Sequence, residues 1–272
     1  MNKIPLSFRK GLQVSFSIIA GISTIVSLWG YTIKDIYDKW PWWAWALILL
    51  IVYILLTVII SVLFCFQEHK GYQTTINGKN VSIIVGDIFL EKGWKVIPFN
   101  EKFDTKVDDI VIAHNTLNGK MIDNYIDDLP DLNNTITAAA SDNSHYKPTY
   151  ENGEALFPLG RIIPYKEYLL LSFTHFDSQK RAYLGVGDYE QLLFRMWEEM
   201  RRVYAAKHIV LPLLGAGITS INGIQEKDYT TLLKCILCTL RNSRFQPEDG
   251  ITIVLTKETI KKINMNTIKE EF

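Results

Sequence analysis

The sequence predicts an α/β protein in two parts, and three observations lead to this prediction. Two long stretches near the N-terminus, Gly11–Tyr31 and Trp42–Phe66, contain no charged residue. Short apolar runs of strand length follow them, and the late ones alternate with amphipathic helical patterns. Such alternation is typical of a mixed sheet with helices on both faces. We therefore expect an N-terminal two-helix transmembrane hairpin, followed by a three-layer α/β/α domain.

The two uncharged stretches are long enough to cross a bilayer, because a spanning helix needs about 20 apolar residues. We expect spans over residues 11–31 and 42–66, within a hairpin of residues 1–66. A signal peptide is the alternative for the first stretch, but its apolar part exceeds the usual ~7–15 residues. Tryptophans gather around the linker Thr32–Pro41, as aromatic residues do at a membrane interface.

Charge gives the expected orientation and narrows the class of partner. Basic residues lie mainly on the side of the two termini, which predicts a two-span protein of the bacterial cell membrane with both termini cytoplasmic. Residues 1–66 hold five basic and two acidic residues, so the remaining 67–272 are mildly acidic within a chain of zero net charge. Nucleic-acid binding needs clustered positive charge, so no nucleic acid is expected as a partner.

The cysteines and histidines do not form a recognisable metal site. Cys65 ends the second uncharged stretch, while Cys235 and Cys238 lie in an amphipathic helical pattern and are expected to be small core residues. No second Cys or His pair lies near them. His114, His145, His175 and His208 also lack metal-ligand spacing. We expect neither a metal nor a cofactor.

The second part is expected to open with a β-hairpin and to end in strands that alternate with helices. Asn77-Gly78 is a strong hairpin signal between two short apolar runs. Residues 123–165 are polar and are expected to form a long excursion with one short helix. The expected strands are Tyr72–Ile76, Asn80–Val85, Trp94–Ile97, Tyr168–Phe173, His208–Leu214 and Ile251–Leu255, and Asp109–Ala113 is extended or helical. The expected later helices are Asp188–Tyr204, opened by a capping box with Gln191, Glu226–Leu240 and Lys257–Ile263.

One of these strands runs directly into a glycine turn, Gly215-Ala216-Gly217. Glycine lets a backbone approach a ligand closely, and successive amides at such a turn bind phosphate or diphosphate. A tight exit turn without a ligand is the alternative. A P-loop is excluded because no lysine stands at the required spacing, and a dinucleotide fingerprint fails because Ser220 replaces its third glycine.

The glycine turn and an earlier Gly86-Asp87-Ile88 turn follow two strands in an order that resembles the macro domain, over roughly residues 72–270. This resemblance implies that Asp87 accepts a hydrogen bond from the adenine amino group of ADP-ribose. It also implies that the glycine turn binds the diphosphate and the neighbouring ribose. Asp87 as a turn or helix cap is the alternative. The expected ligand-binding residues are Asp87, Ile88, Asn100, Glu101, Gly119, Leu214, Gly215, Ala216, Gly217, Ile218 and Thr219.

The sequence also departs from ordinary macro domains. Pro98-Phe99-Asn100-Glu101 stands at the Asn-Ala-Ala-Asn strand end, so Asn100 takes the place of the ribose-facing asparagine, and residues 115–119 hold one glycine instead of a run. These departures argue against hydrolysis of ADP-ribose from proteins.

With the apolar stretches, the departures resemble the membrane-linked macro effectors of Thoeris, a bacterial anti-phage system. That resemblance implies a receptor. Its ligand would be an ADP-ribose derivative, such as a histidine conjugate, made by a TIR-domain partner, and binding would lead to damage of the cell membrane. A hairpin of two spans cannot itself enclose a pore, so a homo-oligomer is expected. No paired carboxylates or activated nucleophile stand out, so an enzyme is not expected. An ADP-ribosyl or nucleotide hydrolase held at the membrane is the alternative, and a plain membrane scaffold is a third possibility.

Overall fold

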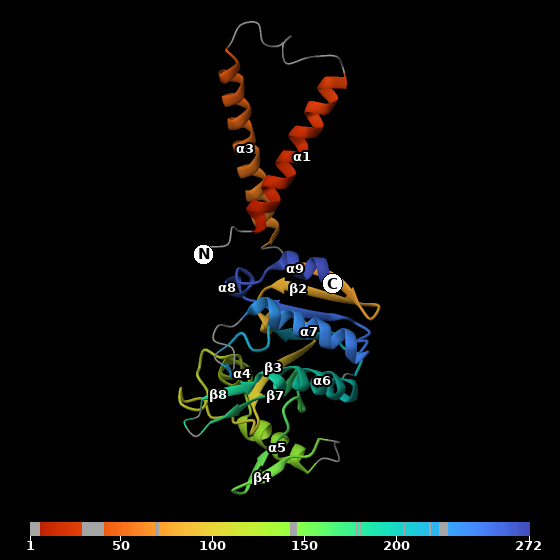
Figure 1. Ribbon diagram of the computed structural model, residues 1–272. Helices are drawn as coiled ribbons and strands as arrows, with labels where there is room; N and C mark the ends of the chain where they lie inside the picture. Colours follow the sequence, from red (N-terminus) through yellow and green to blue (C-terminus); the bar gives the residue numbers. More distant parts are fainter. Residues whose placement is uncertain are drawn as a thin grey trace. The chain divides into compact units, whose positions relative to one another are not determined.

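The computed structural model describes residues 6–28, 41–68, 71–141, 146–177, 179, 181–203, 205–217, 219–222 and 228–272. The chain divides into two compact units, Met1–Lys70 and Gly71–Phe272. Figure 1 labels the elements of both units. The predicted linker lies outside the described residues except for Pro41.

The N-terminal unit contains two helices, α1 (Leu6–Leu28) and α3 (Trp42–Glu68), which pack against each other through small residues. Ser15 and Thr57 are buried, and a Cβ on Gly11 would lie 2.2 Å from the Ser61 hydroxyl oxygen. The Ser15 hydroxyl donates to the Gly11 carbonyl at 2.7 Å, and the Thr57 hydroxyl donates to the Tyr53 carbonyl at 2.8 Å. Small side chains and hydroxyls bonded to their own helix therefore allow the close approach.

The predicted transmembrane hairpin is wrong. Within the described part of the chain, none of the helices combines the length and the apolar character that crossing a membrane requires. The predicted cell-membrane localisation and two-span orientation depended on these spans and are therefore wrong as well. The two helices form where the uncharged stretches predicted them, but an uncharged stretch is not necessarily apolar throughout. In α1 this run is diluted by polar residues such as Gln13 and Ser17.

The C-terminal unit is built on a nine-stranded sheet with the order β1-β2-β11-β9-β3-β7-β8-β10 and with β6 paired to β7. Its strands are β1 (Tyr72–Ile76), β2 (Lys79–Val85), β3 (Trp94–Asn100), β6 (Ile162–Tyr165), β7 (Tyr168–Phe176), β8 (Ala182–Gly185), β9 (Ile209–Pro212), β10 (Ser220–Asn222) and β11 (Ile251–Leu255). Strands β4 (Thr149–Glu151) and β5 (Glu154–Leu156) form a separate hairpin. The helical elements are η1 (Ile88–Leu90), α4 (Leu117–Tyr125), α5 (Leu129–Ala140), α6 (Val186–Val203), α7 (Tyr229–Ser243), α8 (Lys257–Ile260) and α9 (Met265–Glu271).

The sheet is mixed, as predicted, and its centre is parallel. Strands β2, β11, β9, β3 and β7 pair in parallel, while β1, β6 and β8 add antiparallel pairs. The carboxyl ends of the five central strands therefore lie at one edge of the sheet, where α/β proteins commonly bind ligands.

Alternating side chains along the central strands fill two separate cores. In β9, Ile209 and Leu211 join one core, while Val210 between them joins the other. The first core also takes buried residues of α6, α7 and α9, and the second takes residues of α4 and α5. Figure 1 shows α6 and α7 side by side. Because successive strand residues face opposite sides, this pattern gives the predicted three layers.

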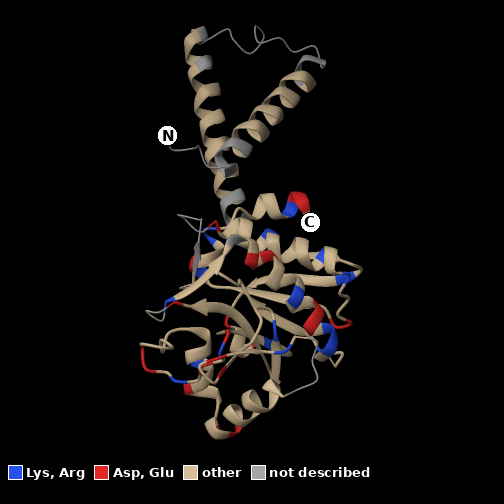
Figure 2. Cartoon of the chain, turned by 60° about the horizontal axis from the view of Figure 1, so that its bottom comes forward, with Lys and Arg blue, Asp and Glu red and all other residues tan. Residues whose placement is uncertain are grey.

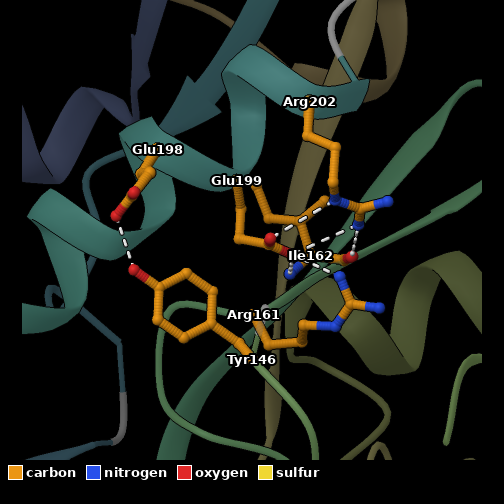
Figure 3. Close-up of polar contacts among 6 residues, drawn as sticks. All are labelled: Tyr146, Arg161, Ile162, Glu198, Glu199 and Arg202. Atoms are coloured by element: carbon orange, nitrogen blue, oxygen red, sulfur yellow. Dashed lines mark hydrogen bonds and ion pairs between the residues drawn. The ribbon is translucent and has the colours of Figure 1, made fainter. Parts of the chain in front are cut away.

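A buried ionic cluster, drawn in Figure 3, joins the end of the long polar segment 123–165 to α6. Glu199 of α6 accepts hydrogen bonds from the guanidinium groups of Arg161 and Arg202 and from the Ile162 backbone N–H. Arg161 and Glu199 are almost completely buried, with 1% and 3% of their side chains exposed. The preceding residue of α6, the exposed Glu198, accepts from the Tyr146 hydroxyl. The cluster fixes the start of β6 to α6.

Candidate functional site

A cavity of about 610 Å³ lies at the carboxyl ends of the central parallel strands. Its wall is built from the segments that follow these strands and from the loop that precedes α4. The lining residues include Gly86–Phe89 after β2, Pro98–Asn100 of β3, Pro212–Gly217 from the end of β9, and Val254–Thr256 at the end of β11. Residues from β7, β8 and the first turn of α4 complete the wall. We refer to this cavity as the cleft.

Asp87 lines one part of the cleft, directly after β2. The Gly86 N–H donates to the Leu255 carbonyl at 3.1 Å, which fixes the turn to β11. Asp87 is the N-cap of η1, because its Oδ1 accepts from the Phe89 N–H at 3.0 Å. Its Oδ2 has no protein partner within the described ranges, and the residue is exposed. The cap therefore occupies one carboxylate oxygen and leaves the other available. Ile88 is buried beneath the turn.

The glycine turn lines the cleft after β9. The Ala216 N–H donates to the Leu213 carbonyl at 3.2 Å, and Gly215 has a φ of 85°. Leu214 is not among the residues with positive φ, so the turn is of type II, which requires glycine or asparagine at this position. The Ala216 amide is therefore engaged within the turn itself.

The end of the glycine turn is open and leads back into buried structure. Gly217 is exposed, and a Cβ added to it would meet no atom within 4 Å. Thr219 also lines the cleft and is buried. Ile218 lies outside the described residues. The structure thus brings Leu214, Gly215, Gly217 and Thr219 to the same cavity as Asp87.

Asn100 lines the cleft, but its own turn occupies its amide. Oδ1 accepts from the N–H groups of Lys102 and Asp104, both at 3.1 Å, and Nδ2 donates to Asp104 Oδ2 at 2.8 Å. Phe103 in this turn has a positive φ of 53°, a conformation that such side-chain bonds help to hold. In this structure the Asn100 amide stabilises the turn and makes no contact across the cleft.

Glu101 is not among the residues that line the cleft. Its Oε2 lies 2.5 Å from His175 Nδ1, and the two side chains are 16% and 31% exposed. The hydrogen bond to Glu101 raises the pKa of His175 above its usual value, and the charge of Asp188 adds to this effect. The strand neighbours of this pair, Asn100 and Thr174, do line the cleft.

Gly119 has a packing role beside the cleft. A Cβ at this position would lie 2.3 Å from the Ala113 carbonyl oxygen, and its N–H donates to the Thr116 N-cap hydroxyl at 3.2 Å. Glycine therefore lets α4 begin close to the preceding loop. The neighbouring Lys120 lines the cleft, although Gly119 does not.

Sequence reasoning missed several lining residues, among them Phe89, Lys120, Thr174 and Phe176. Lys120 is the cationic residue of the described lining, and it lies in the first turn of α4. Lys120 directly follows the predicted Gly119, and this adjacency was the sequence signal that could have identified it. Phe176 had none, because β7 extends three residues beyond the predicted strand end.

The C-terminal unit carries charges of both signs, and its described residues contain no metal-ligand cluster. Figure 2 shows acidic and basic residues interspersed over the C-terminal unit. Among the described residues, no three His, Cys, Asp or Glu side chains lie together so that they could hold a metal ion. Burial raises the pKa of the Cys235 thiol to about 11, so this thiol stays protonated at neutral pH.

The fold and the cleft define a three-layer α/β domain with a cavity at the carboxyl ends of its parallel strands. Residues 81–256 match the family model described as Thoeris protein ThsA, Macro domain, and the chain belongs to this family. It is 34% identical over 241 residues to the Thoeris protein ThsA of Bacillus amyloliquefaciens (strain Y2), covering 82% of this chain and 78% of the relative. The predicted family is thereby confirmed.

Solved structures of lower similarity are also macro domains. The chain is 16% identical to the Oceanobacillus iheyensis macrodomain with ADP, with a TM-score of 0.46, and to the same macrodomain with MES bound, with a TM-score of 0.45. Each match covers 74% of this chain and 98% of the solved chain. The family assignment stands on the family model and on the ThsA relative.

Proposed function

We propose that the C-terminal domain is a receptor for an ADP-ribose-derived nucleotide. One observation carries this proposal: Asp87 and the glycine turn, which are far apart in the sequence, line the same cleft. They follow β2 and β9, which are separated in the sheet by β11 alone. A carboxylate that reads an amino group and a backbone amide that binds an anion thus lie on one wall, as a nucleotide diphosphate requires.

The available polar groups match the two ends of such a ligand. The second Asp87 oxygen accepts a hydrogen bond from the adenine amino group. The Gly215 N–H has no acceptor within the described ranges and donates to a diphosphate oxygen. Lys120 in the cleft wall adds one positive charge. A cavity of about 610 Å³ lies within the ~300–1,000 Å³ range of small-molecule sites.

We favour binding over hydrolysis because Asn100 and Glu101, two of the predicted ligand-binding residues, already make hydrogen bonds within the protein. The Asn100 amide is held by its own turn, and Glu101 is paired with His175. Neither is placed to activate a water molecule without first breaking these bonds. Within anti-phage defence, the ligand is then a signal made by a TIR-domain partner, such as a histidine conjugate of ADP-ribose. Binding of the signal favours assembly of several copies of the chain.

The test is isothermal titration calorimetry of the full chain with ADP-ribose, combined with chromatography of the recovered ligand. Asp87→Ala and Gly217→Glu are expected to lose binding. Gly187→Glu is the matched control, because Gly187 is also open to solvent and does not line the cleft. Binding by the wild type and by this control, with intact ligand recovered, supports the receptor. Steady release of product would show the hydrolase, and no binding by the wild type would refute both.

A further inference from the structure

Tyr189 is a buried side chain of α6 that touches the glycine turn from the core side. Its hydroxyl donates to the Leu214 carbonyl at 2.9 Å, and the Leu232 carbonyl of α7 lies farther away at 3.5 Å. Its ring packs edge-on against Phe173, a residue of the cleft wall, with centroids 6.3 Å apart. Tyr189 itself does not line the cleft.

The bonded carbonyl belongs to the central peptide of the type II turn. Type I and type II turns differ mainly in the orientation of this peptide, which is reversed between the two. In a planar trans peptide the C=O and the following N–H point in opposite directions. A bond that holds the Leu214 carbonyl toward the core therefore directs the Gly215 N–H away from it.

The direction of the Gly215 N–H matters because of where this residue lies. The residue is buried, lines the cleft, and has the positive φ of 85° that a type II turn needs. Its N–H finds no protein acceptor among the described residues. A buried N–H without a partner is costly, and an anionic ligand in the cleft would provide one.

The Tyr189 hydroxyl is suited to this task because it remains a donor. Burial raises its pKa well above the usual value of 10, so the proton stays on the oxygen over the ordinary pH range. A buried hydroxyl also requires a hydrogen-bond partner. The Leu214 carbonyl is the nearer of the two acceptors.

We propose that Tyr189 is a positioning residue: its hydroxyl holds the Leu214–Gly215 peptide so that the Gly215 N–H points at a diphosphate oxygen of the ligand. The inference rests on the proposed function. Without the hydroxyl the packing of the ring is retained, but the peptide is free to reverse. The loss must therefore affect ligands that carry the diphosphate and spare those that lack it.

The test compares the full-length wild type, Tyr189→Phe and Tyr165→Phe. Tyr165 is the matched control, because its buried ring also presents a hydroxyl to a backbone carbonyl, that of Asp128, and it does not line the cleft. ADP-ribose is titrated by calorimetry and adenosine by ligand-observed NMR. We expect Tyr189→Phe to weaken ADP-ribose binding about threefold to tenfold, the equivalent of one hydrogen bond, and to leave adenosine binding unchanged. Tyr165→Phe should change neither.

Equal weakening of both ligands would indicate a merely structural role and overturn the inference, as would unchanged binding of ADP-ribose. If the wild type fails to bind ADP-ribose, the proposed function fails first. If Tyr189→Phe does not fold, a second measurement tests the inference on the wild type alone. It is amide hydrogen exchange in the presence of each ligand. ADP-ribose, but not adenosine, should slow exchange both at the glycine turn and in the first turns of α6. Protection at the turn alone would overturn the inference.

Discussion

Replacing Glu199 by glutamine tests the buried ionic cluster of Figure 3. The substitution removes a negative charge that is 3% exposed and leaves the guanidinium of Arg161, 1% exposed, without its charged partner. Breaking a buried pair costs about 3–5 kcal/mol. The glutamine oxygen still accepts one hydrogen bond, so we expect the lower end, about 3 kcal/mol. At about 2–4 °C per kcal/mol for a domain of this size, the melting temperature falls by about 6–12 °C.

The assay is thermal and urea unfolding followed by circular dichroism, with Glu198→Gln as the control. Glu198 is the preceding residue of the same helix, but it is exposed and pairs with Tyr146. Exposed polar pairs contribute at most about 1 kcal/mol, so the control should melt within a few degrees of the wild type. If both variants lose the same stability, the burial of Glu199 does not matter and the reasoning is refuted.

Three further predictions concern single side chains. Because Glu101 raises the pKa of His175 above 6.5, the pair stabilises the fold below that pH, and this contribution is lost as the pH rises through the raised pKa. The stability difference between wild type and His175→Gln in urea unfolding should therefore be larger at about pH 5.5 than at about pH 8.5; equal differences would contradict this. Gly93→Ala should cost about 2 kcal/mol or more in the same assay, because φ is 122° and the new Cβ lies 2.3 Å from a carbonyl oxygen. Gly187→Ala, in open space, should cost nothing, and equal melting of the two alanine variants would refute the strain. Asp228 is the N-cap of α7, so Asp228→Ala should lower the free energy of unfolding by about 1 kcal/mol, whereas Asp228→Asn should leave it unchanged. Thermal unfolding distinguishes the two variants, and equal losses of stability would rule out the capping role.

The parts of the fold with strong local signals were predictable. Asn77 and Gly78 both adopt positive φ, at 53° and 76°, and they join β1 to β2 as the sequence predicted. The strand Ile251–Leu255 was predicted to the residue. The mixed sheet followed from the alternation of strands and helices.

Other elements had no signal that a single sequence reveals. Strands β8 and β10 have four and three residues, and such short runs owe their pairing to the neighbouring strand and not to propensity. The capping box at Asp188 was wrong, because α6 begins at Val186, directly after β8. The transmembrane prediction took two uncharged stretches as long and apolar enough to span a bilayer, and none of the described helices meets that requirement.

The site was predictable in its two turns and not in its details. Asp87 and the glycine turn were found from their order along the chain, and the structure places both in one cleft. The engagement of the Asn100 amide and the contact of Tyr189 with Leu214 depend on three-dimensional proximity. No spacing in the sequence reveals either one.

The central claim is tested most directly by a crystal structure of the full chain with ADP-ribose. We predict that the adenine amino group donates to Asp87 and that a diphosphate oxygen accepts from the Gly215 N–H. The ligand should be intact, and the Leu214 carbonyl should still accept from Tyr189. ADP-ribose bound outside the cleft, or bound within it without contact to either turn, would contradict the account.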